Sequence, residues 1–120
     1  MARKENVLAK KSFAFSKRIV KLYQFLYQEK KDFVLSRQIL KSGTSIGANV
    51  AEANGAISNH DFSAKISISY KESLETKYWL SLLHETDFIE TKLFESLYKD
   101  CDELSKILFA ILKTTRINNN

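Results

Sequence analysis

One stretch near the middle of the chain, residues 37–53 (RQILKSGTSIGANVAEA), restricts the fold more than any other. Gly43, Gly47 and Ala51 follow one another at intervals of four, so in a helix they form a ridge with almost no side chain. Each interior glycine costs a helix about 1 kcal/mol relative to alanine, so tertiary packing must offset two of them. A turn at Ser42 and Gly43 is the alternative. The apolar period continues in phase through the stretch without a proline, and we therefore predict a helix that another backbone approaches closely.

The rest of the chain also favours helices. Its 120 residues contain no proline and only three glycines, and apolar residues recur at intervals of three and four in four segments joined by short polar links. We expect one all-α domain over residues 1–120, an antiparallel up-down-up-down four-helix bundle. The predicted helices cover residues 9–29, 33–54, 59–84 and 90–115, after a frayed lead-in and before a disordered tail at 116–120.

Local signals mark where the second and third predicted helices begin and end. Asp32 is suited to cap the second helix, and Gly55 lies where a glycine commonly ends one. Ser58 or Asn59 can cap the third helix, with Asp61 in its first turn.

The first predicted helix carries two apolar lines. The main line has spacings of four, three and four and consists of Phe15, Ile19, Leu22 and Leu26. The second line lies roughly 100° or more away and consists of Phe13, Val20 and Tyr27. One core face does not need that width, so the second line is either a flank of the core or a subunit contact.

The third predicted helix has a line that is apolar at its ends and small in its middle. Its members are Phe62, Ile66, Ser69, Ser73, Thr76 and Leu80. Because two faces with small side chains can meet at close range, we expect this small middle to face Gly43 and Gly47.

Positive charge is concentrated at the start of the chain. Residues 1–31 hold nine Lys or Arg against two Glu, whereas the whole chain has a net charge of +5, so the remainder is net negative. The candidate nucleic-acid-binding residues are Arg3, Lys4, Lys10, Lys11, Lys17, Arg18 and Lys21. Such asymmetry suggests a nucleic acid first and an anionic surface second, recognised by charge and geometry because no base-reading motif is present. The alternative is a lysine-rich face that only keeps the protein soluble.

Histidine is too sparse for the di-metal centre that some four-helix bundles hold. That centre needs a glutamate three residues before a histidine on each of two helices. Ile57 and Ser81 stand three residues before His60 and His84, the two histidines of the chain. The sequence has no metal-ligand cluster, phosphate-binding glycine loop or nucleophile elbow. We therefore predict a protein that is not an enzyme and has no catalytic residue, metal or cofactor.

Further polar residues surround the ridge and interrupt the third predicted helix. Asn49 and Glu52 flank the ridge, and Glu72, Glu75 and Trp79 share a line of the third helix. Because a buried carboxylate must be paired or hydrogen-bonded, we expect a structural polar network that sets helix register or faces a subunit interface. The lesser alternative is a hard cation held by the three glutamates.

The single cysteine, Cys101, lies within an apolar period and allows no internal disulfide, so we expect a packed thiol. No N-terminal apolar run occurs, and no stretch approaches the roughly 18 apolar residues of a membrane span. We expect a cytoplasmic protein without a membrane partner.

Several long motifs resemble a known family. Residues 42–53 read SGTSIGANVAEA, with Val50 where the family pattern has isoleucine, and they are followed by DF at 61–62 and KESLETKYWL at 71–80. The FxxRIVKLYxF pattern at 15–25 also fits. The chain thereby resembles, over most of its length, the bacterial four-helix-bundle proteins named for the intervening sequences inserted in some 23S ribosomal RNA genes.

The resemblance implies a left-handed antiparallel bundle and, for several relatives, a homopentameric ring. The chain is also similar to the accessory protein of diversity-generating retroelements, a basic pentameric barrel that associates with a reverse transcriptase and nucleic acid. The family has no established enzymatic activity, and its general function is unknown.

We therefore expect a non-catalytic homo-oligomer, a pentamer, that serves as an RNA-associated scaffold through its basic first helix, with RNA or DNA and a nucleic-acid-processing protein as candidate partners. The alternative is a protein-interaction adaptor that does not itself bind nucleic acid.

Overall fold

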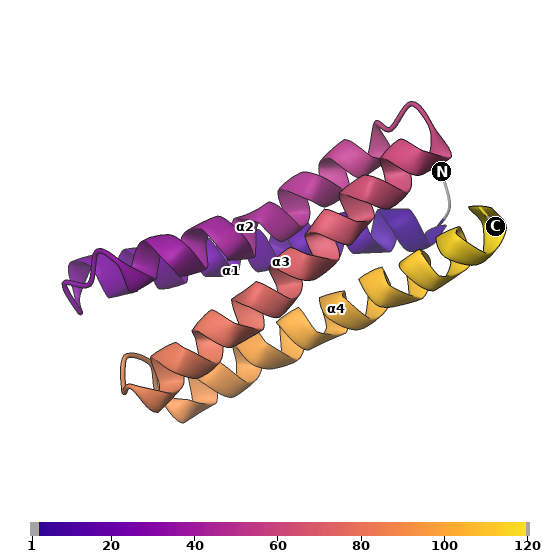
Figure 1. Cartoon of the computed structure of the whole chain (residues 1–120). Helices are drawn as coiled ribbons and strands as arrows, with labels where there is room; N and C mark the ends of the chain where they lie inside the picture. The colour runs from indigo at the N-terminus through magenta and orange to yellow at the C-terminus, as the bar shows by residue number, and fades with distance from the viewer. Residues whose placement is uncertain (1–2, 120) are drawn as a thin grey trace.

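The computed structural model describes the backbone of residues 3–119 and the side chains of residues 7–115. Four helices follow one another: α1 (Arg3–Gln28), α2 (Leu35–Asn54), α3 (Asn59–Glu85) and α4 (Thr91–Asn119). In Figure 1 the α1–α2 and α3–α4 links lie toward one end of the molecule and the α2–α3 link toward the other. The predicted all-α, up-and-down four-helix bundle is confirmed.

Two helices are longer than the sequence analysis predicts. α1 begins at Arg3 rather than near residue 9, and Leu8, in the second turn, is already buried in the core. α4 continues to Asn119 and so includes residues 116–119, which the sequence analysis assigns to a tail. The hydroxyls of Thr114 and Thr115 bond to the carbonyls one turn earlier, which keeps these threonines within the helical pattern. Asn120 lies outside the described residues.

The predicted helix ends are largely confirmed. Ser58 is the N-cap of α3, and its hydroxyl accepts the backbone N–H of Asp61 at 3.0 Å. At the start of α2 the prediction was wrong by two residues: the helix begins at Leu35 rather than 33, and its N-cap is Val34, which makes no side-chain capping bond. Asp32 is not the N-cap, but its carboxylate accepts the N–H of Ser36 in the first turn at 2.7 Å. Gly55 is the C-cap of α2, with φ −102°, and does not use the left-handed conformation.

Each helix packs against two neighbours, in the order α1, α2, α3, α4 and back to α1, and α1 and α4 approach each other over the shortest length. The main apolar line of α1 is buried, as the sequence predicts. It meets buried aliphatic residues of the other three helices, including Ile46, Leu80 and Leu104. The core is therefore continuous along the bundle, which measures 47 × 21 × 20 Å along its principal axes.

The glycine ridge faces α1. A Cβ at Gly43 would lie 2.8 Å from two side-chain carbons of Ile19, and one at Gly47 would lie 3.0 Å from Ser16 Oγ. The prediction that the ridge faces the small middle of α3 was wrong. The atoms nearest to an added Cβ at Gly43 and Gly47 all belong to α1, from Ile19, Ser16 and Ser12. The close approach is that of α1 to α2, and it is made possible by the missing side chains.

The small residues of α3 contact other parts of α2 and α4. Ser69 Oγ donates to the backbone carbonyl of Ile46 at 2.8 Å, a bond from α3 to the main chain of α2. Ser105 Oγ of α4 donates to Ser73 Oγ at 2.7 Å, and Cys101 Sγ donates to the carbonyl of Ser73 at 3.3 Å. Burial raises the pKa of Cys101 to about 12. The cysteine is therefore the packed, protonated thiol that the sequence predicts.

The hydroxyl of Ser42 is buried like that of Ser69, but it makes no hydrogen bond. Among the side chains of residues 7–115, its Oγ is the one buried side-chain oxygen or nitrogen without a hydrogen-bond partner. Ser42 and Ser69 are both completely buried, so they form a matched pair that differs in hydrogen bonding.

We expect Ser42→Ala to leave the free energy of unfolding unchanged or to raise it by up to about 1 kcal/mol, because the change removes an unpaired buried hydroxyl. Ser69→Ala is expected to lower it by about 1 kcal/mol, because the bond to Ile46 is lost. Urea denaturation of both variants tests the difference. An equal loss in both would show that Ser42 has a hydrogen-bond partner in solution.

Candidate nucleic-acid interface

Two of the predicted basic residues are engaged in holding α1 to α4. Lys11 Nζ lies 3.0 Å from Glu103 Oε1, and Arg18 Nη1 lies 2.7 Å from Asp100 Oδ2. Arg18 also donates through Nη2 to Ser96 Oγ at 3.0 Å. Since α1 and α4 share the least close packing, these bonds help join them. Lys11 and Arg18 are therefore less available to a partner than the sequence suggests.

Three other lysines form an outward row, here called the lysine row: Lys10, Lys17 and Lys21. All three are exposed, and none forms an ion pair with a side chain of residues 7–115. Along the helix, Lys10 and Lys17 are separated by about 10 Å of axial rise, and Lys21 follows after about 6 Å more. Arg3 and Lys4 lie outside the residues whose side chains are described.

The second apolar line of α1 lies beside the lysine row. The side chains of Phe13, Val20 and Tyr27 are 65%, 40% and 45% exposed. The line is therefore not a buried flank of the core, and its alternative role as a subunit contact stays a prediction. At its far end Tyr27 packs edge-on against Phe33, with ring centroids 4.8 Å apart.

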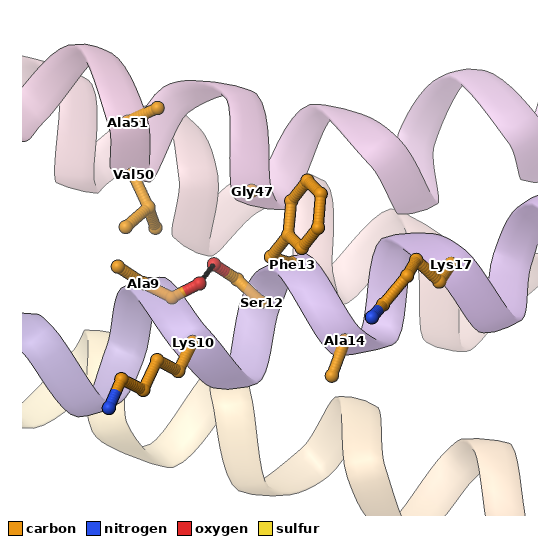
Figure 2. A pocket seen from close by; sticks show the side chains of 9 residues that line it. All are labelled: Ala9, Lys10, Ser12, Phe13, Ala14, Lys17, Gly47, Val50 and Ala51. Atoms are coloured by element: carbon orange, nitrogen blue, oxygen red, sulfur yellow. Dashed lines mark hydrogen bonds between the residues drawn. The ribbon is translucent and has the colours of Figure 1, made fainter.

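A groove runs between α1 and α2 next to Phe13 (Figure 2). It encloses about 540 Å³, and Figure 2 shows Phe13 directed toward α2 near Gly47. Gly47 and Ala51 line it from α2, where the lack of large side chains leaves the hollow open. Lys17 Nζ lies 5.4 Å from the centroid of the Phe13 ring, within the range of a cation–π interaction.

This groove is not predicted from the sequence. Both of its walls are recognisable there separately, as an extra apolar line and as a ridge of small residues, but the ridge was predicted to face α3. The signal that could have located the groove is the combination of the two. Where a ridge of small residues packs against α1, a hollow remains beside the contact, and the neighbouring side chains of α1 line that hollow.

In the structure, residues of the predicted polar network make separate hydrogen bonds to near neighbours in the chain. Asn49 Nδ2 donates to the carbonyl of Ser45 one turn earlier at 2.8 Å, and Trp79 Nε1 donates to Glu75 Oε2 at 3.0 Å. Both bonds stay within one helix. Glu75 is exposed, whereas Asn49 and Trp79 are half-buried and Trp79 packs against the core.

The remaining two acids of that set also lie apart. Glu52 is exposed and pairs with Lys65 at 2.8 Å, and this hydrogen bond and the charge of Glu52 raise the pKa of Lys65. Glu72 is half-buried, and its backbone carbonyl accepts the hydroxyl of Thr76. Within the described part of the chain, no three histidine, cysteine or acidic side chains come together as a metal site would require.

A second groove, between α3 and α4, is smaller, at about 270 Å³. At its centre Lys77 Nζ lies 2.6 Å from Asp102 Oδ1, while Lys106 Nζ lies 3.0 Å from Oδ2. Hydrogen bonds from the two lysines lower the pKa of Asp102. Apolar side chains at its edges, Leu74 and Phe109, are each more than two-fifths exposed.

Comparison with known proteins extends over most of the chain. The model of a family described as "23S rRNA-intervening sequence protein" matches residues 4–110. A crystal structure of a protein of unknown function from the S23 ribosomal protein family of Bacteroides thetaiotaomicron superposes with a TM-score of 0.90. The two sequences are 51% identical, and the match covers 92% of this chain and 98% of the other. Comparison with the curated proteins finds no match. None of the four helices, over the described residues, is long and apolar enough to cross a membrane.

Proposed function

The chain belongs to the family of 23S rRNA-intervening sequence proteins, and from this premise we propose that it is a non-catalytic, cytoplasmic homo-oligomer that binds RNA through the outward face of α1. The observation that carries the proposal is the lysine row. Lys10, Lys17 and Lys21 present three exposed charges on one side of a rigid helix, and no described acid neutralises them. Such a row can follow a phosphate backbone, to which it binds by releasing condensed counterions.

We expect the triple charge reversal Lys10→Glu, Lys17→Glu and Lys21→Glu to abolish RNA binding at low salt while leaving the fold intact, since these side chains are exposed. The milder triple change to glutamine should make log affinity fall less steeply with log salt concentration. The magnitude of the slope should decrease by about 2, because three phosphate contacts are lost. Fluorescence anisotropy with a labelled RNA pool at several salt concentrations measures both effects.

A matched control uses three exposed lysines of α4, changed in the same way: Lys92, Lys99 and Lys113. This control alters the net charge by the same amount on another helix, and we expect it to weaken binding far less. If both triple variants weaken binding equally, net charge is responsible and the lysine row is not a site. If neither changes it, the proposal is wrong.

We further propose that five copies form a ring in which the groove between α3 and α4 of each copy packs against a different surface of the next copy, because a closed ring needs a heterologous contact. The support is the exposure of two large side chains that line this groove, Leu74 and Phe109, at 43% and 45%. A ring would repeat the lysine row around its circumference, so that weak single contacts add up to useful avidity.

The double change Leu74→Glu and Phe109→Glu is expected to convert the oligomer into monomers, because two carboxylates cannot be desolvated at an apolar contact without partners. Light scattering measures the mass in solution, and circular dichroism checks that the bundle remains helical. A parent protein that is monomeric, or a variant of unchanged mass, would contradict this assignment.

The second candidate function is that of an adaptor for another protein, and the mainly apolar lining of the α1–α2 groove favours it. The candidate partner is a nucleic-acid-processing protein, as the resemblance to the retroelement accessory protein implies. A partner that co-purifies after nuclease treatment, from cells producing the triple lysine-to-glutamate variant as well as the parent, would support the adaptor function over the scaffold.

A further inference from the structure

We propose that the groove between α1 and α2 is a base-stacking site for single-stranded nucleic acid, with Phe13 as the stacking surface and Lys10 and Lys17 as the phosphate contacts. This inference rests on the proposed function and specifies its ligand. The two lysines and Phe13 are neighbours on α1, and all three line the groove (Figure 2).

Phe13 is unusually exposed for an aromatic residue of this bundle. Its side chain is 65% exposed, more than any other phenylalanine of the described residues, although a phenylalanine ring gains free energy by burial. The ring is not covered by the protein's own core, and Lys17 holds its charge 5.4 Å from the ring centroid. An aromatic ring beside a lysine is the combination by which proteins hold single strands: the ring stacks on a base and the lysine neutralises the adjacent phosphate.

The wall of the groove opposite Phe13 is formed by small residues of α2. A side chain at Gly47 would project toward α1, where its Cβ would already lie 3.0 Å from Ser16 Oγ. Gly47 and Ala51 line the hollow beside Phe13 without large side chains, and this open hollow has a volume of about 540 Å³, room for a planar base. The only hydrogen bond drawn within it in Figure 2 runs from Ser12 Oγ to the carbonyl of Ala9, so that hydroxyl is already engaged.

A phenylalanine ring can stack on a base of a single strand but not on a base inside a duplex. In a duplex each base face is covered by the next base pair, so a ring set in a hollow between two helices cannot stack on it. In a single strand the bases can turn out and present a face. Lysine contacts alone would serve both forms, whereas Phe13 can serve only the single strand.

A similar groove at the other end of α1 supplies a matched control. It encloses about 500 Å³ and contains the same kind of pair, with Lys30 Nζ 5.8 Å from the centroid of the Phe25 ring. Asp87 and Glu90 also line it, and their carboxylates repel phosphate. We therefore assign base stacking to the Phe13 groove and not to the Phe25 groove.

The test measures the affinity of the full chain for a labelled oligouridylate of about 12 nucleotides and for an RNA duplex of the same length, by fluorescence anisotropy at low salt. Phe13→Leu keeps an apolar side chain but removes the ring, and we expect it to bind the single strand about five- to 100-fold more weakly with duplex binding unchanged. Phe13→Trp should retain single-strand binding, and Phe25→Leu should leave both affinities unchanged.

Three outcomes would overturn the inference, and they differ in what they say about the proposed function. If the parent binds the single strand and Phe13→Leu binds it equally well, the stacking site is wrong while the lysine row stands. If the parent binds only the duplex, the ligand class is wrong. If the parent binds neither RNA at any salt concentration, the proposed function fails together with the inference. Thermal unfolding of each variant checks that the exposed substitutions leave the bundle folded.

Discussion

Replacement of Gly43 by leucine is expected to lower the free energy of unfolding by about 1–3 kcal/mol or more. A Cβ at this position would lie 2.8 Å from Cγ1 and Cγ2 of Ile19, closer than real Cβ contacts, and a leucine adds three further carbons. Ile19 is completely buried and packed on all sides, so it cannot turn away. The strain must therefore be relieved by moving α1 away from α2, which opens the core along both helices.

Urea denaturation measures the loss for Gly43→Leu, with Ala48→Leu as the matched control on the same helix. Ala48 is exposed, so the same leucine should change the free energy of unfolding there by no more than about 0.5 kcal/mol. A Gly43→Leu protein that unfolds at the same urea concentration as the parent would show that α1 and α2 are not in close contact at this point.

Replacement of Ile19 by alanine is expected to cost about 2–5 kcal/mol, the second large effect. The side chain has no exposed surface and packs against Gly43 of α2, so truncation leaves a cavity that neighbouring helices cannot readily fill. The measurement is again urea denaturation, with Val20→Ala as the control on the adjacent, partly exposed position of α1.

The two substitutions together form a double-mutant cycle. If Ile19 and Gly43 are in contact, the leucine can occupy part of the cavity left by Ile19→Ala, and the double variant should be more stable than the sum of the two losses by about 0.5–3 kcal/mol. Strictly additive losses would contradict the contact. The cycle therefore tests the α1–α2 geometry that also forms the groove beside Phe13.

The same geometry relates stability to the candidate interface. The small residues of α2 let α1 come close, Phe13 lies beside this contact in the groove between the two helices, and the lysine row is exposed. The ion pairs of Lys11 and Arg18 with α4 hold the other side of α1. α1 is thus fixed from two sides, and its remaining face presents one defined arrangement of charge and aromatic surface.

Much of the fold could be predicted because its signals are local. Apolar residues spaced three and four apart determine which face of a helix is buried, and Ser58 caps α3 through a bond to Asp61, three residues away. Burial of Cys101 likewise followed from its place in an apolar period. In each of these cases the residues that interact, or the period that predicts them, lie within one helix or its cap.

The candidate site could be predicted only in part. Lys10 and Lys11 are neighbours in the sequence and equally basic, yet only Lys11 meets an acid of α4, 92 positions away. The distinction depends on which side of α1 the fourth helix packs, and that information is spread over the whole bundle. The bonds made by charged residues of α3 depend on the same information: Glu75 accepts the indole N–H of Trp79 on its own helix, whereas Lys77 pairs with Asp102 of α4.

The sequence alone accounts for four helices, their buried faces, the excess of charge on α1 and the small residues at 43 and 47. Which helix meets those small residues follows from the packing of the bundle. On a helix each residue turns by about 100°, so a ridge displaced by one position from the core line faces a different neighbour, and helix periodicity alone does not say on which side that neighbour lies. Packing of all four apolar faces into one core determines the neighbour. As a result α1 packs against the glycines, and Phe13 lies beside an open groove.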